Sequence, residues 1–142
     1  MSDIGRFQKL SVKRGLTPGA LLDASPQDFD ILLISIRRGF SADSQYTERA
    51  VNDLLKIWLD GPGGMLDIDH VELRRWLVDL QILSRDVYGQ AYKLEPVPTR
   101  LQQLDLLLAD VDFASEFAKA NELESQRRAA RKAAWAQARE SA

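Results

Sequence analysis

The chain contains no cysteine among its 142 residues, which excludes disulfide bonds, thiolate metal sites and cysteine nucleophiles together. It has one histidine, His70. No apolar run approaches the roughly 20 residues that a membrane-spanning helix needs. Residues 1–6 lack the apolar stretch of a secretory signal. We therefore expect a cytoplasmic protein that does not cross a membrane.

Residue patterns typical of catalysis are also missing. We find no nucleophile beside a base, and the loop Gly61–Gly64 lacks the Gly-Lys-Ser/Thr ending of a phosphate-binding loop, so we interpret it as a linker between helices. His70 follows Asp67 and Asp69, but one histidine and two carboxylates so close in sequence rarely complete a metal site. The sequence thus favours a protein that is not an enzyme and uses neither a metal nor a cofactor.

What the chain does contain is a globular composition with an uneven charge distribution. Hydrophobic residues make up 45% and charged residues 28%, and the net charge is -2. The charged residues between 101 and 124 are mostly acidic. The segment from Gln126 to Arg139 has only basic charges: Arg127, Arg128, Arg131, Lys132 and Arg139. Binding to nucleic acid would therefore have to come from local basic patches.

Three helices followed by a hairpin are predicted between residues 26 and 95. Ser25-Pro26 opens the first helix, Thr47 caps the second, and the third begins after Asp67 or Asp69. The buried side of the third helix is expected to contain Val71 or Leu73, with Trp76, Leu77 and Leu80. Residues 82–86 and 91–94 then read as two strands around a turn at 87–90.

This order predicts a mainly α fold, a winged helix-turn-helix with a short β-hairpin wing and additional C-terminal helices. The boundaries are an N-terminal segment, 1–25, a winged-helix domain, 26–95, and a C-terminal helical extension with a basic tail, 99–142. The N-terminal segment stays uncertain, because Gly15, Pro18 and Gly19 interrupt any helix there, although Phe7 and Leu10 could pack.

The C-terminal extension is predicted to be helical from Thr99, which we take as its cap. Leu101, Leu104, Leu108 and Val111 follow helical spacing, and Phe117 adds apolar surface. Two interpretations stay open for this segment: a homodimer helix acting through Leu101, Leu104, Leu108 and Phe117, or a helix that packs back on its own domain. A last helix is expected from about Glu122 to Arg139.

Several segments resemble a known bacterial family. They are Tyr46-Thr47-Glu48-Arg49-Ala50-Val51-Asn52-Asp53-Leu54-Leu55, the stretch His70–Asp79 that contains Leu-Arg-Arg-Trp-Leu-Val-Asp, Leu83-Ser84-Arg85-Asp86 and Gly89-Gln90-Ala91-Tyr92. The family is the bacterial domain of unknown function 2087. The resemblance covers about Pro26 to Leu94 and implies a winged-helix fold with a transcription-related role. Gln81 stands where the family usually has glycine.

We predict a DNA-binding, transcription-associated protein that contacts DNA through the third helix and the wing. The candidate contacts are Arg74, Arg75 and His70 on the helix, Arg85 and Lys93 on the wing, and Arg127, Arg128, Arg131 and Lys132 in the tail. Alternatively, Arg74 or Arg75 pairs with Glu72 or Asp79 on the same helix. The tail is either a nucleic-acid arm, or a solvated helix, or a partner of the acidic stretch before it.

The competing function is a protein-binding subunit of a larger assembly, such as an RNA-rich ribosome. In that interpretation the C-terminal helices and the basic tail dock on the partner. Tyr88 and Trp135 are expected to be exposed, and a lone tryptophan on a polar helix favours contact with another surface.

Overall fold

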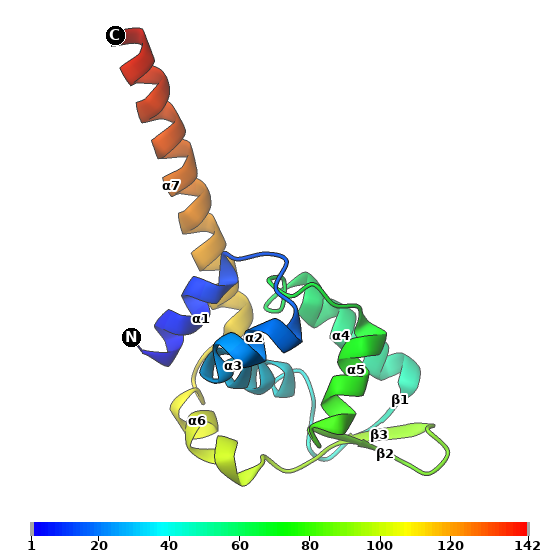
Figure 1. Ribbon diagram of the computed structural model, residues 1–142. Coiled ribbons are helices and arrows are strands. Elements are labelled where there is room, and N and C mark those ends of the chain that lie inside the picture. Colours follow the sequence, from blue (N-terminus) through cyan, green and yellow to red (C-terminus); the bar gives the residue numbers. More distant parts are fainter. Residues whose placement is uncertain (1, 142) are drawn as a thin grey trace.

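The computed structural model describes residues 2–141, and Met1 and Ala142, which end the two terminal segments expected from the sequence, lie outside it. The chain is mainly helical, and a small sheet lies at one end of its body (Figure 1). Its elements are α1 (Asp3–Ser11), α2 (Pro18–Ala24), α3 (Pro26–Arg37), β1 (Gln45–Thr47), α4 (Glu48–Asp60), α5 (His70–Asp79), β2 (Leu83–Arg85), β3 (Ala91–Leu94), the 3-10 helix η1 (Thr99–Leu101), α6 (Gln102–Leu107) and α7 (Phe113–Ser141).

Side-chain caps start the three predicted helices. Ser25, Thr47 and Asp69 each accept a hydrogen bond from the backbone N–H three residues further on, at 3.4, 3.1 and 2.8 Å. A cap of this kind satisfies one of the N–H groups that a helix start leaves without a partner. The predicted starts of α3, α4 and α5 are thereby confirmed.

The sheet consists of three short antiparallel strands in the order β1-β3-β2. The hairpin β2–β3 was predicted, and it pairs Ser84 with Lys93. β1 was not predicted; it pairs Tyr46 with Tyr92 on the other edge of β3. Three helices followed by a hairpin, with β1 between the first and second helix, give the mainly α fold with a β-hairpin that the sequence predicted.

The connection between α4 and α5 is longer than the three or four residues of a simple helix-turn-helix. Within it, Gly63 packs so closely that a Cβ there would overlap the ring of Trp58. The N-terminal segment holds this loop, because the Leu16 N–H donates to the Met65 carbonyl at 3.0 Å and the Asp67 N–H donates to the Leu16 carbonyl at 2.7 Å. Residues 1–25 therefore help to fix the approach to α5.

The N-terminal segment is also more helical than the sequence suggested. Pro18 and Gly19 do not interrupt a helix: Pro18 occupies the first turn of α2, where its missing N–H has no helical partner to lose. Phe7 and Leu10 are buried, as expected, in the same core as α3. The segment is part of the folded body.

The C-terminal extension corrects two predictions. Thr99 is not a helix cap; it begins η1 after Pro98. The segment from Leu101 to Phe117 is not one helix either, because α6 ends at Leu107 and α7 begins at Phe113, well before the expected start near Glu122. Leu108 turns back into the core between them, and the Asp112 carboxylate accepts a hydrogen bond from the Ser115 N–H at 3.0 Å.

Two of the four residues proposed for a dimer contact are buried within the chain itself. Leu101 and Leu108 are each 1% exposed and belong to the chain's own core. Leu104 and Phe117 are partly buried against the same core. The interpretation in which this segment packs back on its own domain therefore holds for Leu101 and Leu108.

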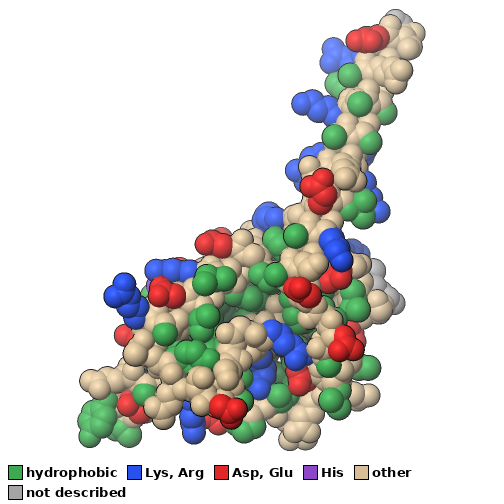
Figure 2. All heavy atoms as spheres, turned by 180° about the vertical axis from the view of Figure 1, so that it is seen from behind, with side chains coloured by type: hydrophobic (Ala, Val, Ile, Leu, Met, Phe, Trp, Pro, Cys, Tyr) green, Lys and Arg blue, Asp and Glu red, His purple; other side chains and the backbone are tan. Residues whose placement is uncertain are grey.

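The last helix leaves the body of the molecule. α7 is 29 residues long, about 43 Å at the helical rise per residue, and its second half projects as an isolated rod (Figures 1 and 2). Within residues 2–141, no helix combines the length and the apolar character needed to cross a membrane.

Candidate nucleic-acid interface

The orientation of α5 follows from its two buried leucines. Leu73 is 4% exposed and Leu77 is fully buried, which turns the opposite face of the helix outward. Glu72, Arg75 and Asp79 lie on that outer face, three or four residues apart. α5 thus presents one cation between two carboxylates.

Arg74 has a different environment from its neighbour Arg75. Its side chain is 14% exposed and pairs with Glu48 of α4 at 2.9 Å. The same guanidinium donates to the Asn52 side chain and lies 6.0 Å from the ring centroid of Tyr92. The pairing of Arg74 with Glu72 or Asp79 on its own helix, considered from the sequence, is wrong. Arg74 instead joins α5 to α4 and β3.

Two adjoining clefts lie where α5 meets the hairpin. One, of about 310 Å³, is lined by Arg74, Arg75, Val78, Asp79, Arg85 and Tyr92. The other, of about 280 Å³, shares Arg85 and Tyr92 and adds Lys93 with Gln45 of β1. We call the two together the α5–hairpin cleft. The first cleft contains Arg75 of α5 and Arg85 of β2, and the second contains Arg85 and Lys93 of β3, so Arg85 is the cation that the two clefts share.

These three cations are available to a ligand. Arg75, Arg85 and Lys93 are all exposed, and none takes part in an ion pair with another described residue. The sequence pointed to these residues but not to Gln45, because β1 is too short to show the alternation of a strand.

The hairpin ends in an exposed apolar tip. Val87 is 97% and Tyr88 83% exposed, which confirms the expectation for Tyr88. The Gln90 N–H donates to the Asp86 carboxylate at 2.8 Å, and this hydrogen bond is the main cause that lowers the pKa of Asp86 below its ordinary value. Asp86 thereby stabilises the turn that presents Val87 and Tyr88.

His70 lies apart from the α5–hairpin cleft. It is the first residue of α5, partly buried, next to the cap Asp69. It lines neither of the two clefts. In the described part of the chain, no group of three or more histidine, aspartate or glutamate side chains is placed to hold a metal ion.

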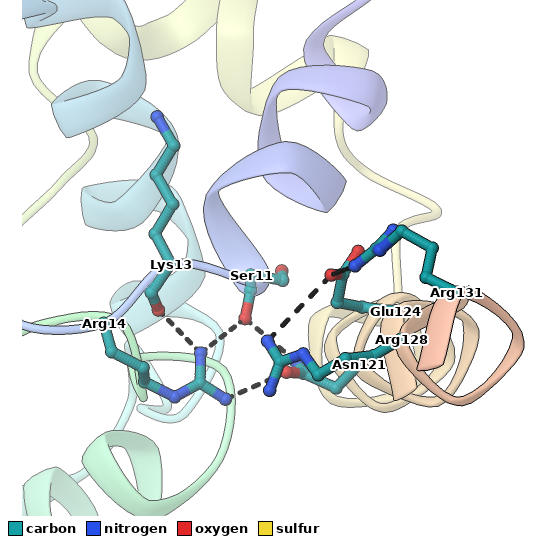
Figure 3. A network of polar contacts seen from close by, with 7 residues as sticks. All are labelled: Ser11, Lys13, Arg14, Asn121, Glu124, Arg128 and Arg131. Atoms are coloured by element: carbon teal, nitrogen blue, oxygen red, sulfur yellow. Dashed lines mark hydrogen bonds and ion pairs between the residues drawn. The ribbon is translucent and has the colours of Figure 1, made fainter. Parts of the chain in front are cut away.

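The basic tail forms a second group of candidate residues. Arg127, Arg128, Arg131 and Lys132 are exposed on the projecting half of α7, and that half and the hairpin lie at opposite ends of the molecule (Figure 1). Glu124 pairs with Arg128 at 3.9 Å and with Arg131 at 3.2 Å (Figure 3). Apart from His70, the predicted contacts therefore fall into two groups, one that lines the α5–hairpin cleft and one on this tail.

Comparison with known proteins identifies a bacterial family. The sequence profile of a bacterial family, described as uncharacterized protein conserved in bacteria (DUF2087), matches residues 24–94, which is half of the chain. The match runs from the end of α2 to the end of β3, so it includes every residue of the α5–hairpin cleft. No curated protein and no solved structure matches the chain.

Proposed function

We propose that this chain, which belongs to the uncharacterized bacterial family DUF2087, binds duplex DNA through the α5–hairpin cleft as a transcription-associated module. The observation that carries the proposal is the set of three exposed cations, Arg75, Arg85 and Lys93, that line the cleft without an ion pair among the described residues. Arginine and lysine donate to phosphate oxygens, and arginine also reads guanine edges.

The charges on α5 and on the hairpin suggest that the helix and the hairpin make different contacts with DNA. An α-helix is 10–12 Å wide and enters the major groove, which is about 12 Å wide. On α5, Arg75 reaches guanine, while Glu72 and Asp79 repel phosphates but accept hydrogen bonds from cytosine. Arg85 and Lys93 on the hairpin then supply the phosphate contacts. Arg74 serves to hold α5 against α4 rather than to contact DNA.

Mobility-shift titrations of the full chain with random-sequence duplex, at several salt concentrations, test this proposal. The triple variant Arg75→Gln, Arg85→Gln, Lys93→Gln should bind more weakly, and the slope of log affinity against log salt should fall by about 2 to 3. Its matched control removes the same charge from other exposed sites, Lys9→Gln, Lys13→Gln, Lys56→Gln. Equal affinities and slopes for the two triple variants would rule out the cleft as the DNA contact.

A second candidate function, protein docking, is favoured by the exposed apolar side chains outside the cleft. Leu106 and Leu107 of α6 are 76% and 65% exposed, in addition to Val87 and Tyr88 of the hairpin tip. A protein partner, including a second copy of the chain, would bury them. Sedimentation of the full chain, with Leu106→Ser, Leu107→Ser as the comparison, tests self-association. A monomer at all concentrations would eliminate the homodimer.

A further inference from the structure

The projecting half of α7 has no packing partner in the molecule. We call residues Gln126–Ser141 the arm. Every one of its side chains is exposed, although the segment is helical to its end (Figure 2). An isolated helix of this length gains nothing from burial, so only its alanine-rich composition and its connection to the packed half maintain it.

The first half of α7, Phe113–Glu124, is by contrast a rigid root. Phe113 packs edge-on against Phe7 with ring centroids 5.0 Å apart. The Asn121 side chain donates to the Ser11 carbonyl at 2.8 Å and accepts from the Arg14 guanidinium at 2.9 Å (Figure 3). These contacts fix the direction in which the arm leaves the body.

The cations of the arm share one face of the helix. At 3.6 residues per turn, they fall with Trp135 within an arc of about 140°, and the opposite side is neutral apart from Glu140. The basic face contains Arg127, Arg128, Arg131, Lys132, Trp135 and Arg139; the opposite side contains Gln126, Ala129, Ala133 and Ala136. We call these the basic face and the neutral face. A merely solvated helix needs no such segregation.

The basic face is only partly neutralised within the protein. Glu124 at the top of the root pairs with two of its arginines, Arg128 and Arg131, whose side chains stay 75% and 64% exposed. Like charges three or four residues apart, such as Arg127 with Arg131, destabilise a helix. An anionic partner removes this repulsion, whereas a cationic or apolar one does not.

A second copy of the arm is a poor partner for the same reason. Pairing two basic faces sets five cations of one copy against five of the other. In an antiparallel pair that brings Trp135 of one copy over Leu123 of the other, the arginines of both copies lie between these two contacts. Duplex DNA has one negative charge per 1.7 Å of its axis, and its major groove accommodates a single helix. The deep, narrow major groove of an RNA duplex does not.

We propose that the basic face of the arm is a second DNA-binding surface, separate from the α5–hairpin cleft and held at the opposite end of the molecule. One molecule then holds two duplex segments at once. Binding by the arm stands independently of the function proposed above, whereas the bridging of two segments rests on it.

The salt dependence of DNA binding by the full chain tests the arm. The variant Arg127→Gln, Arg128→Gln, Arg131→Gln, Lys132→Gln, Arg139→Gln keeps residues with good helix propensity and removes the basic face. Because the two sites hold separate duplex segments, its slope of log affinity against log salt should fall by about 2, from that of five phosphate contacts in the arm to that of three in the cleft. The matched control, Ala129→Gln, Ala133→Gln, Ala136→Gln on the neutral face, should match the unaltered chain. An unchanged slope in the five-residue variant would overturn the proposal.

Comparison with the cleft variant separates the two hypotheses. Loss of binding on substituting Arg75, Arg85 and Lys93, with no effect of the arm variant, would leave the cleft as the DNA site and refute the arm. The reverse pattern would establish the arm and refute the cleft. Polyglutamate and duplex RNA serve as competitors for labelled DNA that is bound to the cleft variant. If either competitor displaces this DNA as effectively as unlabelled DNA does, the arm is not a DNA surface.

Bridging is measured by capture of a labelled duplex on an immobilised one. The unaltered chain should capture the second duplex, and either the cleft or the arm variant should abolish the capture. Binding to each single duplex without capture of a second one would refute the two-segment arrangement.

Discussion

The two halves of α7 are continuous in the chain and helical for different reasons. In the root, Phe113 is 4% exposed and Phe117 packs beside Gly64, so tertiary contacts select the helix. In the arm, no side chain is buried, and local propensity together with the connection to the root maintains the same backbone. A helix assignment therefore does not show whether a segment belongs to the cooperative core. The burial of its side chains does.

The same contrast exists on a smaller scale within α5. Arg74 and Arg75 are neighbours in sequence, yet Arg74 is held by Glu48 and Asn52 while Arg75 is exposed in the α5–hairpin cleft. Residues that are equivalent as charges thus divide into one that stabilises the fold and one that is free to bind.

The largest effect is expected from Phe113→Ala. This side chain fills the space between α1 and α7, and truncation of a buried phenylalanine costs about 3–5 kcal/mol of unfolding free energy. Equilibrium denaturation in urea measures the loss. Trp135→Ala is the matched control in the arm, because Trp135 is 65% exposed, and it should change the unfolding free energy by less than about 0.5 kcal/mol. Similar losses in both variants would mean that the arm packs in solution.

A smaller loss is expected from Arg74→Ala. The substitution removes the ion pair with Glu48, the charged hydrogen bond to Asn52 and the contact with the Tyr92 ring, at a cost of about 1–3 kcal/mol. Arg75→Ala should leave stability nearly unchanged and weaken DNA binding instead. Thermal unfolding measures the stability of both variants, and fluorescence anisotropy measures their binding to DNA. If Arg75→Ala were the more destabilising variant, the assignment of the two arginines would be reversed.

These residues also show how far the sequence could predict the structure. The caps Ser25, Thr47 and Asp69 and the hairpin were predictable because their signals are local. The partner of Arg74 was not, because Glu48 lies on another helix and the sequence offered nearer carboxylates. β1 and the break before α7 depend on pairing with β3 and on the burial of Leu108, both of which are tertiary.

The substitution Gln81→Gly is expected to stabilise the fold. The φ of Gln81 is 60°, in the left-handed region that costs a residue with a side chain about 1–2 kcal/mol. Gln81→Gly relieves this strain but gives the unfolded chain more freedom, so the unfolding free energy should rise by about 0.5–1 kcal/mol. Gln90→Gly, at an exposed position without positive φ, is the control and should not stabilise. Equal changes in unfolding free energy for Gln81→Gly and Gln90→Gly would show that the conformation of Gln81 is unstrained.

The smallest effect on global stability is expected from a glycine in the arm, and it gives the sharpest test of the comparison. Ala133→Gly and Ala118→Gly make the same change at exposed positions of one helix, the first in the arm and the second in the root. Each costs about 1 kcal/mol of local helix stability. Because the root unfolds with the core, Ala118→Gly should lower the global unfolding free energy by that amount. Ala133→Gly should leave it unchanged and speed amide exchange within Gln126–Ser141 alone, since the arm frays independently. A global loss from Ala133→Gly would place the arm in the cooperative unit and remove the distinction between the two halves of α7.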